Sequence, residues 1–146
     1  MKILNDLEKQ VQQNPNDPSV LLRLANQQQD MRIFSKAVGT YEKYLTMVPA
    51  DANARVDLGV SYFELSLTDS VHGFELGQAA IASIEKALTF APRHQAALLN
   101  LGIISLQFGD LKKSREWLKK CAAIDTTTDP GKKAQQLLNQ HNFTNP

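Results

Sequence analysis

Small residues recur along this chain at a fixed spacing, and that spacing constrains the fold more than any other feature. A Leu-Ala or Leu-Gly pair occurs three times, with spacings of 34 and then 43 residues. A series of alanine or serine residues and a series of prolines show the same two spacings. The three series are Leu24-Ala25, Leu58-Gly59 and Leu101-Gly102; Ala37, Ala80 and Ser114; and Pro15, Pro49 and Pro92. The pattern is therefore a 34-residue repeat with one insertion of nine residues between Gly59 and Ala80. A repeat of this length indicates helical hairpins stacked as a solenoid.

Each period has the signals of two helices. Asp17 and Pro18 suit the N-cap and first position of a helix, and Pro49 and Asp51 stop one helix and cap the next. Apolar residues at helical spacing then predict helices over Pro18 to about Gln29, Phe34 to Met47, a stretch from Ala52, about Gln78 to Phe90, Gln95 to Phe108, and Leu111 to about Ile124.

The small residues explain why the hairpins stack. Gly59 and Gly102 occupy the same position of the first helix in two repeats. A glycine inside a helix costs about 1 kcal/mol relative to alanine, so two at equivalent positions indicate a packing role. Without side-chain bulk at these positions, the helix axes can approach one another closely.

These residues resemble the tetratricopeptide repeat (TPR) family. The matches are Leu24-Ala25, Ala37, Tyr41 and Pro49 in the first repeat; Leu58-Gly59, Tyr62, Ala80, Ala87 and Pro92 in the second; and Leu101-Gly102, Gly109-Asp110 and Leu118 in the third. The third repeat departs from the family pattern at Ser114 and Thr126, and the aromatic residue usual at the fourth position is replaced by Leu21, Arg55 and Leu98. The resemblance implies an all-α, right-handed solenoid of antiparallel helix pairs.

We expect residues 1–146 to form one domain. Its parts are a half-repeat or capping helix at 1–13, repeats at 18–49, 52–92 and 95–126, and a capping helix at 129–141. The first helix is either a cap or the second helix of a repeat whose first half lies upstream.

The insertion, at about 66–78, lengthens the turn of the second hairpin. Insertions in repeat proteins map to loops on one face and often lie near the binding surface, but long loops are also tolerated without any role. Phe74 and Leu76 could fold back onto the hairpin or contact a partner.

No motif for catalysis or cofactor binding is found in the sequence. His72, His94 and His141 are far apart, and Cys121 falls at an inward position that predicts a buried, inert thiol. With a net charge of +1 and no long apolar run, we expect no enzyme, no cofactor, no metal, no nucleic acid partner and no membrane insertion of this segment. The compartment stays open: the chain is soluble, cytoplasmic or the soluble part of an anchored or exported protein.

In the TPR family the first helices line a concave groove, and the resemblance implies which residues would project into it. In this chain they are Leu22, Asn26, Gln29, Val56, Val60, Phe63, Leu99, Asn100, Ile103 and Leu106. One TPR class binds acidic C-terminal tails of chaperones through Lys, Arg and Asn side chains. Only Asn26 matches that clamp, because Leu22, Asp57, Ala96 and Asn100 replace its other members, so a clamp of this kind is disfavoured.

An apolar groove with scattered asparagines favours an extended segment or an amphipathic helix of a partner protein as ligand. The same apolar residues could instead serve only to pack adjacent first helices. Two further alternatives are a module for structural self-association, which would make a homo-oligomer, and the TPR portion of a larger envelope or secretion-assembly protein. Fold-level analogy does not choose among these functions.

Overall fold

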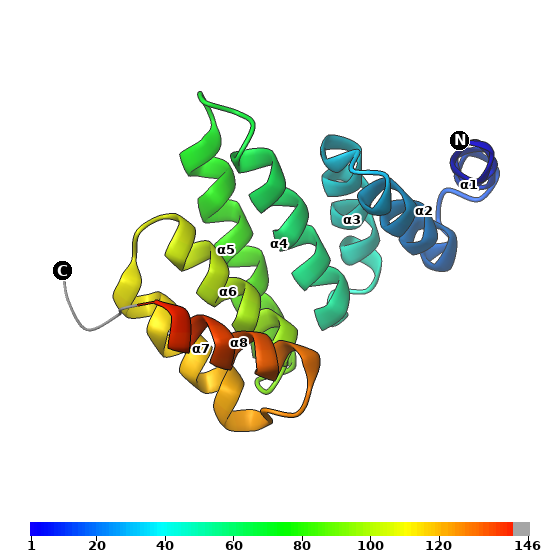
Figure 1. Cartoon of the computed structure of the whole chain (residues 1–146). Coiled ribbons are helices and arrows are strands. Elements are labelled where there is room, and N and C mark those ends of the chain that lie inside the picture. Colours follow the sequence, from blue (N-terminus) through cyan, green and yellow to red (C-terminus); the bar gives the residue numbers. More distant parts are fainter. Residues whose placement is uncertain (142–146) are drawn as a thin grey trace. The chain divides into compact units, whose positions relative to one another are not determined.

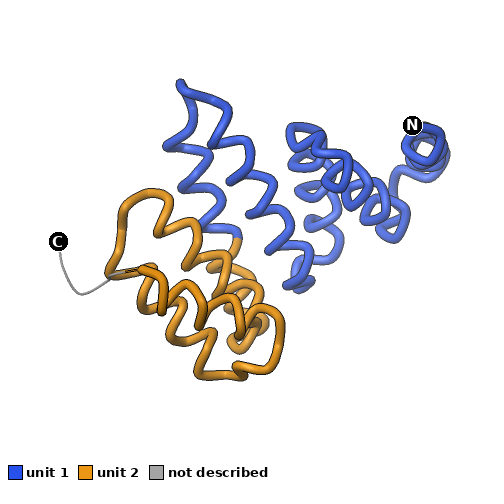
Figure 2. Tube along the Cα trace, in the orientation of Figure 1, with its two compact units in different colours: residues 1–83 blue, residues 84–146 orange. Residues whose placement is uncertain are grey.

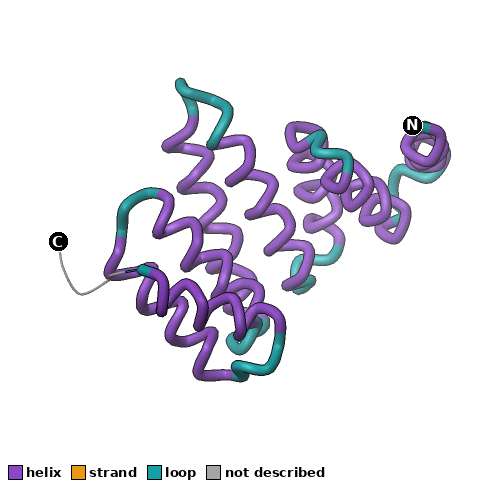
Figure 3. The backbone as a smooth tube through the Cα atoms, viewed as in Figure 1, coloured by secondary structure: helices purple, strands orange, loops and turns teal. Residues whose placement is uncertain are grey.

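The structure of the protein, a computed structural model, describes residues 1–141 and contains eight α-helices and no strand in that part of the chain (Figure 1). The helices are α1 (Lys2–Gln13), α2 (Pro18–Asp30), α3 (Phe34–Met47), α4 (Ala52–Ser66), α5 (Gly73–Phe90), α6 (Gln95–Gln107), α7 (Leu111–Ile124) and α8 (Asp129–Gln140). Figure 3 shows that only short loops join them. The expected all-α architecture of paired helices is confirmed, and most helix ends lie within one residue of the sequence prediction.

The chain divides into two compact units, residues 1–83 and residues 84–146, with the boundary inside α5 (Figure 2). In unit 1, α1 packs on α2, α2 on α3, and α3 on α4. Fully or almost fully buried side chains of α2, α3 and α4 form its main core: Leu21, Ala25, Ala37, Tyr41, Tyr44, Leu45, Ala54 and Leu58. The small residues Ala25 and Ala37 are completely buried, as the repeat pattern predicts.

In unit 2, α6 packs on α7 and on α8, and α7 packs on α8. Their core contains Leu98, Leu118, Cys121, Ala122, Ala134 and Leu137. A Cβ placed on Gly102 would stand 2.5 Å from the Cδ2 atom of Leu118. The hydroxyl of Ser114 donates a hydrogen bond to the Gly102 carbonyl oxygen at 2.7 Å. The helix pair therefore depends on a glycine and a small polar residue at its closest approach.

The first helix of each hairpin begins at an equivalent capping residue. Asp17 accepts a hydrogen bond from the Ser19 N–H, and Asp51 accepts one from the Ala54 N–H. At the equivalent position of the third repeat, Nδ1 of His94 accepts a hydrogen bond from the Ala97 N–H at 3.1 Å. The repeat phase places His94 at the capping position, but histidine is not among the preferred N-cap residues, so the sequence does not predict this role.

The turns inside the first and third hairpins also match. Arg32 follows α2 with a φ of 60°, and Gly109 follows α6 with a φ of 81°. In both turns the next N–H bonds to a carbonyl five residues back, from Ile33 to Gln28 and from Asp110 to Ser105. The left-handed conformation suits glycine and strains arginine.

The insertion differs from its expected form. The sequence predicts a loop over about 66–78, but α4 continues to Ser66 and α5 starts at Gly73, so only residues 67–72 are non-helical. Gly73 is expected in a loop, whereas it permits a close approach: a Cβ there would lie 2.9 Å from the Ser66 carbonyl oxygen. The inserted residues are thus divided between a short loop and an extra turn of α5.

Candidate partner-binding surface

The residues expected to project from the first helices are called here the groove row. In unit 1 the row runs along α2 as Leu22, Asn26 and Gln29 and along α4 as Val56, Val60 and Phe63. Asn26 is exposed, while Leu22 and Gln29 are half-buried, and Leu22 packs against the core of unit 1. The row on α2 thus has one apolar and two amide side chains.

Gln29 brings the α2 and α4 parts of the row together. Its Nε2 donates to the carbonyl oxygen of Asp57 at 2.8 Å and to the hydroxyl oxygen of Ser61 at 3.0 Å. Ser61 is completely buried, so this amide satisfies a polar group between the helices. Gln29 therefore joins α2 to α4, and its half-buried side chain is still partly accessible.

Tyr41 on α3 fixes the two amides of the row. Its hydroxyl donates to Oδ1 of Asn26 at 2.7 Å and lies 3.1 Å from Oε1 of Gln29. The ring is completely buried, and burial, followed by the charges of Asp57 and Asp30, holds the pKa of the phenol well above its usual value. The sequence identifies Tyr41 as a position of the repeat pattern, but it does not predict that the hydroxyl bonds to the row.

Asp57 is an acidic side chain of α4 that lies next to the row residue Val56 in sequence. Burial, followed by the negative charges of Asp51 and Asp30, raises the pKa of its carboxyl from 3.8 to about 6. This part of unit 1 is therefore an environment that favours a positive charge.

The α4 residues of the row are less accessible than the groove prediction assumes. Val56 is only 4% exposed and therefore belongs to the core, while Val60 and Phe63 are half-buried. Packing accounts for Val56 without any ligand. Val60 and Phe63 keep some surface that a partner can reach.

In unit 2 the row lies on α6, as Leu99, Asn100, Ile103 and Leu106. All four side chains are half-buried. Leu99 and Ile103 pack against the unit 2 core, and Asn100 donates from Nδ2 to the Ala96 carbonyl oxygen of its own helix at 2.9 Å. The row on α6 is thus an apolar face with one amide that is bonded within its helix.

The cysteine of this chain lies outside the row. Cys121 is completely buried, and burial raises the pKa of its thiol, which disfavours the reactive thiolate. Within residues 1–141 no three His, Cys, Asp or Glu side chains are grouped as metal ligands. In the same range, every helix is too short or too polar to cross a membrane.

The fold defines the class of protein: it is all-helical and built from repeated antiparallel helical hairpins. Residues 75–127 match the family model described as tetratricopeptide repeat. The chain has the fold of solved TPR proteins, and the match to the family model is limited to this segment. No match was found among proteins with curated annotation.

Several solved TPR structures are similar to the chain. TTC0263 from Thermus thermophilus, a thermophilic TPR protein, has 20% identity and a TM-score of 0.75, with 94% of this chain and 73% of that one covered. MamA from Desulfovibrio magneticus has 21% identity and a TM-score of 0.75, with 88% and 67% covered. PcrH, solved in complex with the chaperone binding region of PopD, has 16% identity and a TM-score of 0.72, with 91% of each chain covered.

Proposed function

We propose that the protein is a non-enzymatic interaction module that binds a peptide or an amphipathic helix of a partner protein through the groove row. The observation that carries the proposal is the apolar face of α6. Leu99, Ile103 and Leu106 follow one another at helical spacing, and each keeps part of its side chain accessible. Half-buried apolar side chains in a row are suited to receive the apolar residues of a partner segment.

The unit 1 part of the row supports a ligand with polar features as well. Asn26 is exposed at a position where Tyr41 already orients its amide, so less conformational freedom is lost when it bonds a peptide backbone. Asp57 favours a lysine or arginine nearby. We therefore expect the partner segment to combine apolar anchors with a basic residue.

The known structures are consistent with a protein ligand. PcrH has the same fold over 91% of each chain and is solved with a region of another protein, PopD. The proposed repeat boundaries, 18–49, 52–92 and 95–126, place the row on the first helix of each repeat.

The experiment starts by capturing partners with the full chain and measuring the affinity of the captured protein by calorimetry. Leu106→Asp removes an apolar anchor and introduces a charge, and Phe63→Ala removes an aromatic one. We expect each to weaken binding by about tenfold or more, because a few central anchors dominate such interfaces.

The matched control is Ile3→Asp, which also replaces an exposed apolar residue with a charge, on a helix outside the row; Ile3 is 63% exposed. It should leave the affinity unchanged. Equal affinities for the wild type and both row variants would show that the groove proposal is wrong.

A further inference from the structure

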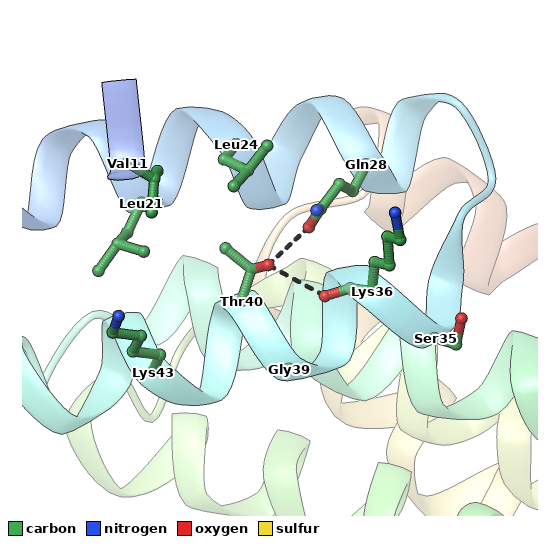
Figure 4. A pocket seen from close by; sticks show the side chains of 9 residues that line it. All are labelled: Val11, Leu21, Leu24, Gln28, Ser35, Lys36, Gly39, Thr40 and Lys43. Carbon is green, nitrogen blue, oxygen red and sulfur yellow. Dashed lines mark hydrogen bonds between the residues drawn. The ribbon is translucent and has the colours of Figure 1, made fainter. Parts of the chain in front are cut away.

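A second surface of unit 1 has the features of a binding pocket. A pocket of about 280 Å³ opens between α1, α2 and α3 and shares no residue with the groove row (Figure 4). Its lining residues are Val11, Leu21, Leu24, Gln28, Ser35, Lys36, Gly39, Thr40 and Lys43. The base is apolar, two lysines on α3 stand at its edge, and no carboxylate lines it.

The polar groups at the centre of the pocket are already bonded. The Thr40 hydroxyl donates to Oε1 of Gln28 at 2.7 Å and lies 3.0 Å from the Lys36 carbonyl oxygen, as Figure 4 shows. These groups do not require a polar ligand. The pocket therefore suits an apolar side chain whose neighbours are negatively charged.

Gly39 lines the pocket at an exposed position of α3. A Cβ added at Gly39 would meet nothing within 4 Å, although the residue is inside α3. A glycine in a helix costs about 1 kcal/mol relative to alanine, and close packing, which explains Gly102, does not explain Gly39. The open space above Gly39 is what a side chain entering the pocket would use.

The loop between α4 and α5 has the complementary features. Leu67, Val71 and Phe74 are 50%, 81% and 74% exposed, which is unusual for three large apolar residues within eight positions. We call them, with the adjoining carboxylates Asp69 and Glu75, the tip. Glu75 is exposed beside Phe74.

The tip is held in one conformation. The Asp69 carboxylate accepts hydrogen bonds from the N–H groups of Val71 and His72, at 3.0 and 2.8 Å, and its other oxygen lies 3.0 Å from Nδ1 of His72. The main-chain bond of His72 and then its ring bond lower the pKa of Asp69. Because these contacts order the loop, it presents its apolar side chains without a large loss of conformational entropy on binding.

We propose that the tip of one molecule docks in the pocket of a second copy of this chain. Phe74 would enter the apolar space above Gly39, and Glu75 would lie near Lys36 or Lys43. The two surfaces are complementary in charge, both have apolar side chains, and both belong to unit 1. The exposure of the tip shows that it does not occupy the pocket of its own chain.

A single tip in a single pocket is a heterologous contact, which generates rings or open chains, whereas two copies that exchange tips form a closed two-fold dimer. The tip is also small compared with a standard interface of about 1,600 Å², so the association is weak and depends on concentration.

The test measures the mass of the full chain by analytical ultracentrifugation from about 10 µM to about 1 mM, the range in which weak contacts form. The wild type should exceed the monomer mass progressively. Phe74→Asp should remain a monomer because it lacks the tip, and the double variant K36E/K43E should remain a monomer because it lacks the cationic edge. Ile3→Asp, an exposed apolar residue outside both surfaces, should associate as the wild type does.

Mixing the variants tests whether the tip binds the pocket. Phe74→Asp retains a pocket and K36E/K43E retains a tip, so an equimolar mixture should form a dimer that cannot grow further. Glu75→Lys should restore self-association when combined with K36E/K43E. A wild type that is monomeric at about 1 mM, a tip variant that associates unchanged, or a mixture that stays monomeric would each overturn the proposal.

This outcome is independent of the groove proposal. Leu106→Asp should leave self-association unchanged, and Phe74→Asp should leave the affinity for a captured partner unchanged. Failure of one proposal therefore does not imply failure of the other.

Discussion

The hairpins α2–α3 and α6–α7 are built on the same repeat positions and are held together in different ways. In the first, Ala25 and Ala37 stand at the close approach and Tyr41 is the large residue beneath the row. In the second, Gly102, Ser114 and Leu118 take these positions. Tyr41 bonds to the amides of the row, whereas Leu118 fills the space against Gly102.

The difference extends to the row itself. Above Tyr41 the row on α2 has Asn26 and Gln29, and at the equivalent positions above Leu118 the row on α6 has Ile103 and Leu106. A buried hydroxyl needs acceptors, so a tyrosine in the core is matched by amides on the surface helix. The residue beneath the row thus helps determine whether the row is polar or apolar.

The largest effect is expected where the two hairpins differ at their closest approach. Gly102→Ala introduces the residue that the first hairpin has at its equivalent position, but the new Cβ would lie 2.5 Å from Leu118 Cδ2. Leu118 is completely buried, so its displacement should outweigh the gain in helix propensity. We expect the free energy of unfolding to fall by about 2 kcal/mol, measured by urea denaturation.

Gly39→Ala is the matched control for this variant. No atom lies within 4 Å of the added Cβ, so the gain in helix propensity should raise stability by up to about 1 kcal/mol. If both variants were stabilised equally, Leu118 would be free to move and close packing would not distinguish the hairpins.

A smaller loss is expected from Tyr41→Phe. The change keeps the buried ring and removes the hydroxyl that donates to Asn26 at 2.7 Å. Asn26 is exposed and water can replace the lost donor, so the cost should be about 1 kcal/mol in the free energy of unfolding. Leu118→Met, which keeps an apolar residue of similar volume, is the control in the other hairpin. A Tyr41→Phe variant as stable as the wild type would show that the amides of the row do not depend on this hydroxyl.

The smallest effect concerns Asp57 and its equivalent in unit 2, Asn100. Because the folded-state pKa of Asp57 is raised from 3.8 to about 6, the folded protein binds this proton more tightly than the unfolded chain does. The resulting stability is fully present below the unfolded pKa and is lost as pH rises through the folded pKa.

Asp57→Asn should therefore be more stable than the wild type above about pH 6, by at most about 1 kcal/mol, because solvent reduces the effect at a partly exposed carboxylate. Below about pH 4 the two proteins should be equally stable. Urea denaturation at several pH values measures this difference. If the difference in the free energy of unfolding were the same at every pH, protonation of Asp57 would not be its cause.

The repeat phase made most of the helices predictable. The predicted bounds of Phe34–Met47 and Leu111–Ile124 agree with α3 and α7, since Pro49 follows the first and the capping residue Asp110 precedes the second, while the repeat phase sets their other ends. The predicted start of α5 was wrong because Gly73 suggests a loop in the sequence, while its role is to approach the Ser66 carbonyl oxygen. A sequence does not distinguish these two uses of glycine.

The groove row was harder to predict than the helices. Repeat phase assigns Gln29 to the row, but an amide can bond a ligand or a neighbouring helix, and only three-dimensional contacts show that Gln29 bonds Asp57 and Ser61. Likewise, Val56 has the expected phase and is nevertheless buried. Periodicity identifies the face of a helix, whereas accessibility depends on what packs against it.

The equivalent turns at Arg32 and at Gly109 have a practical consequence for engineering. Ser66 is the equivalent residue of the second hairpin, and the additional loop residues follow it. One of the three equivalent turns therefore already contains an insertion. The entropy of closing a loop grows slowly with its length. Residues 109–110 are therefore a suitable insertion point for an epitope or a fluorescent label, at which α6 and α7 should keep their packing.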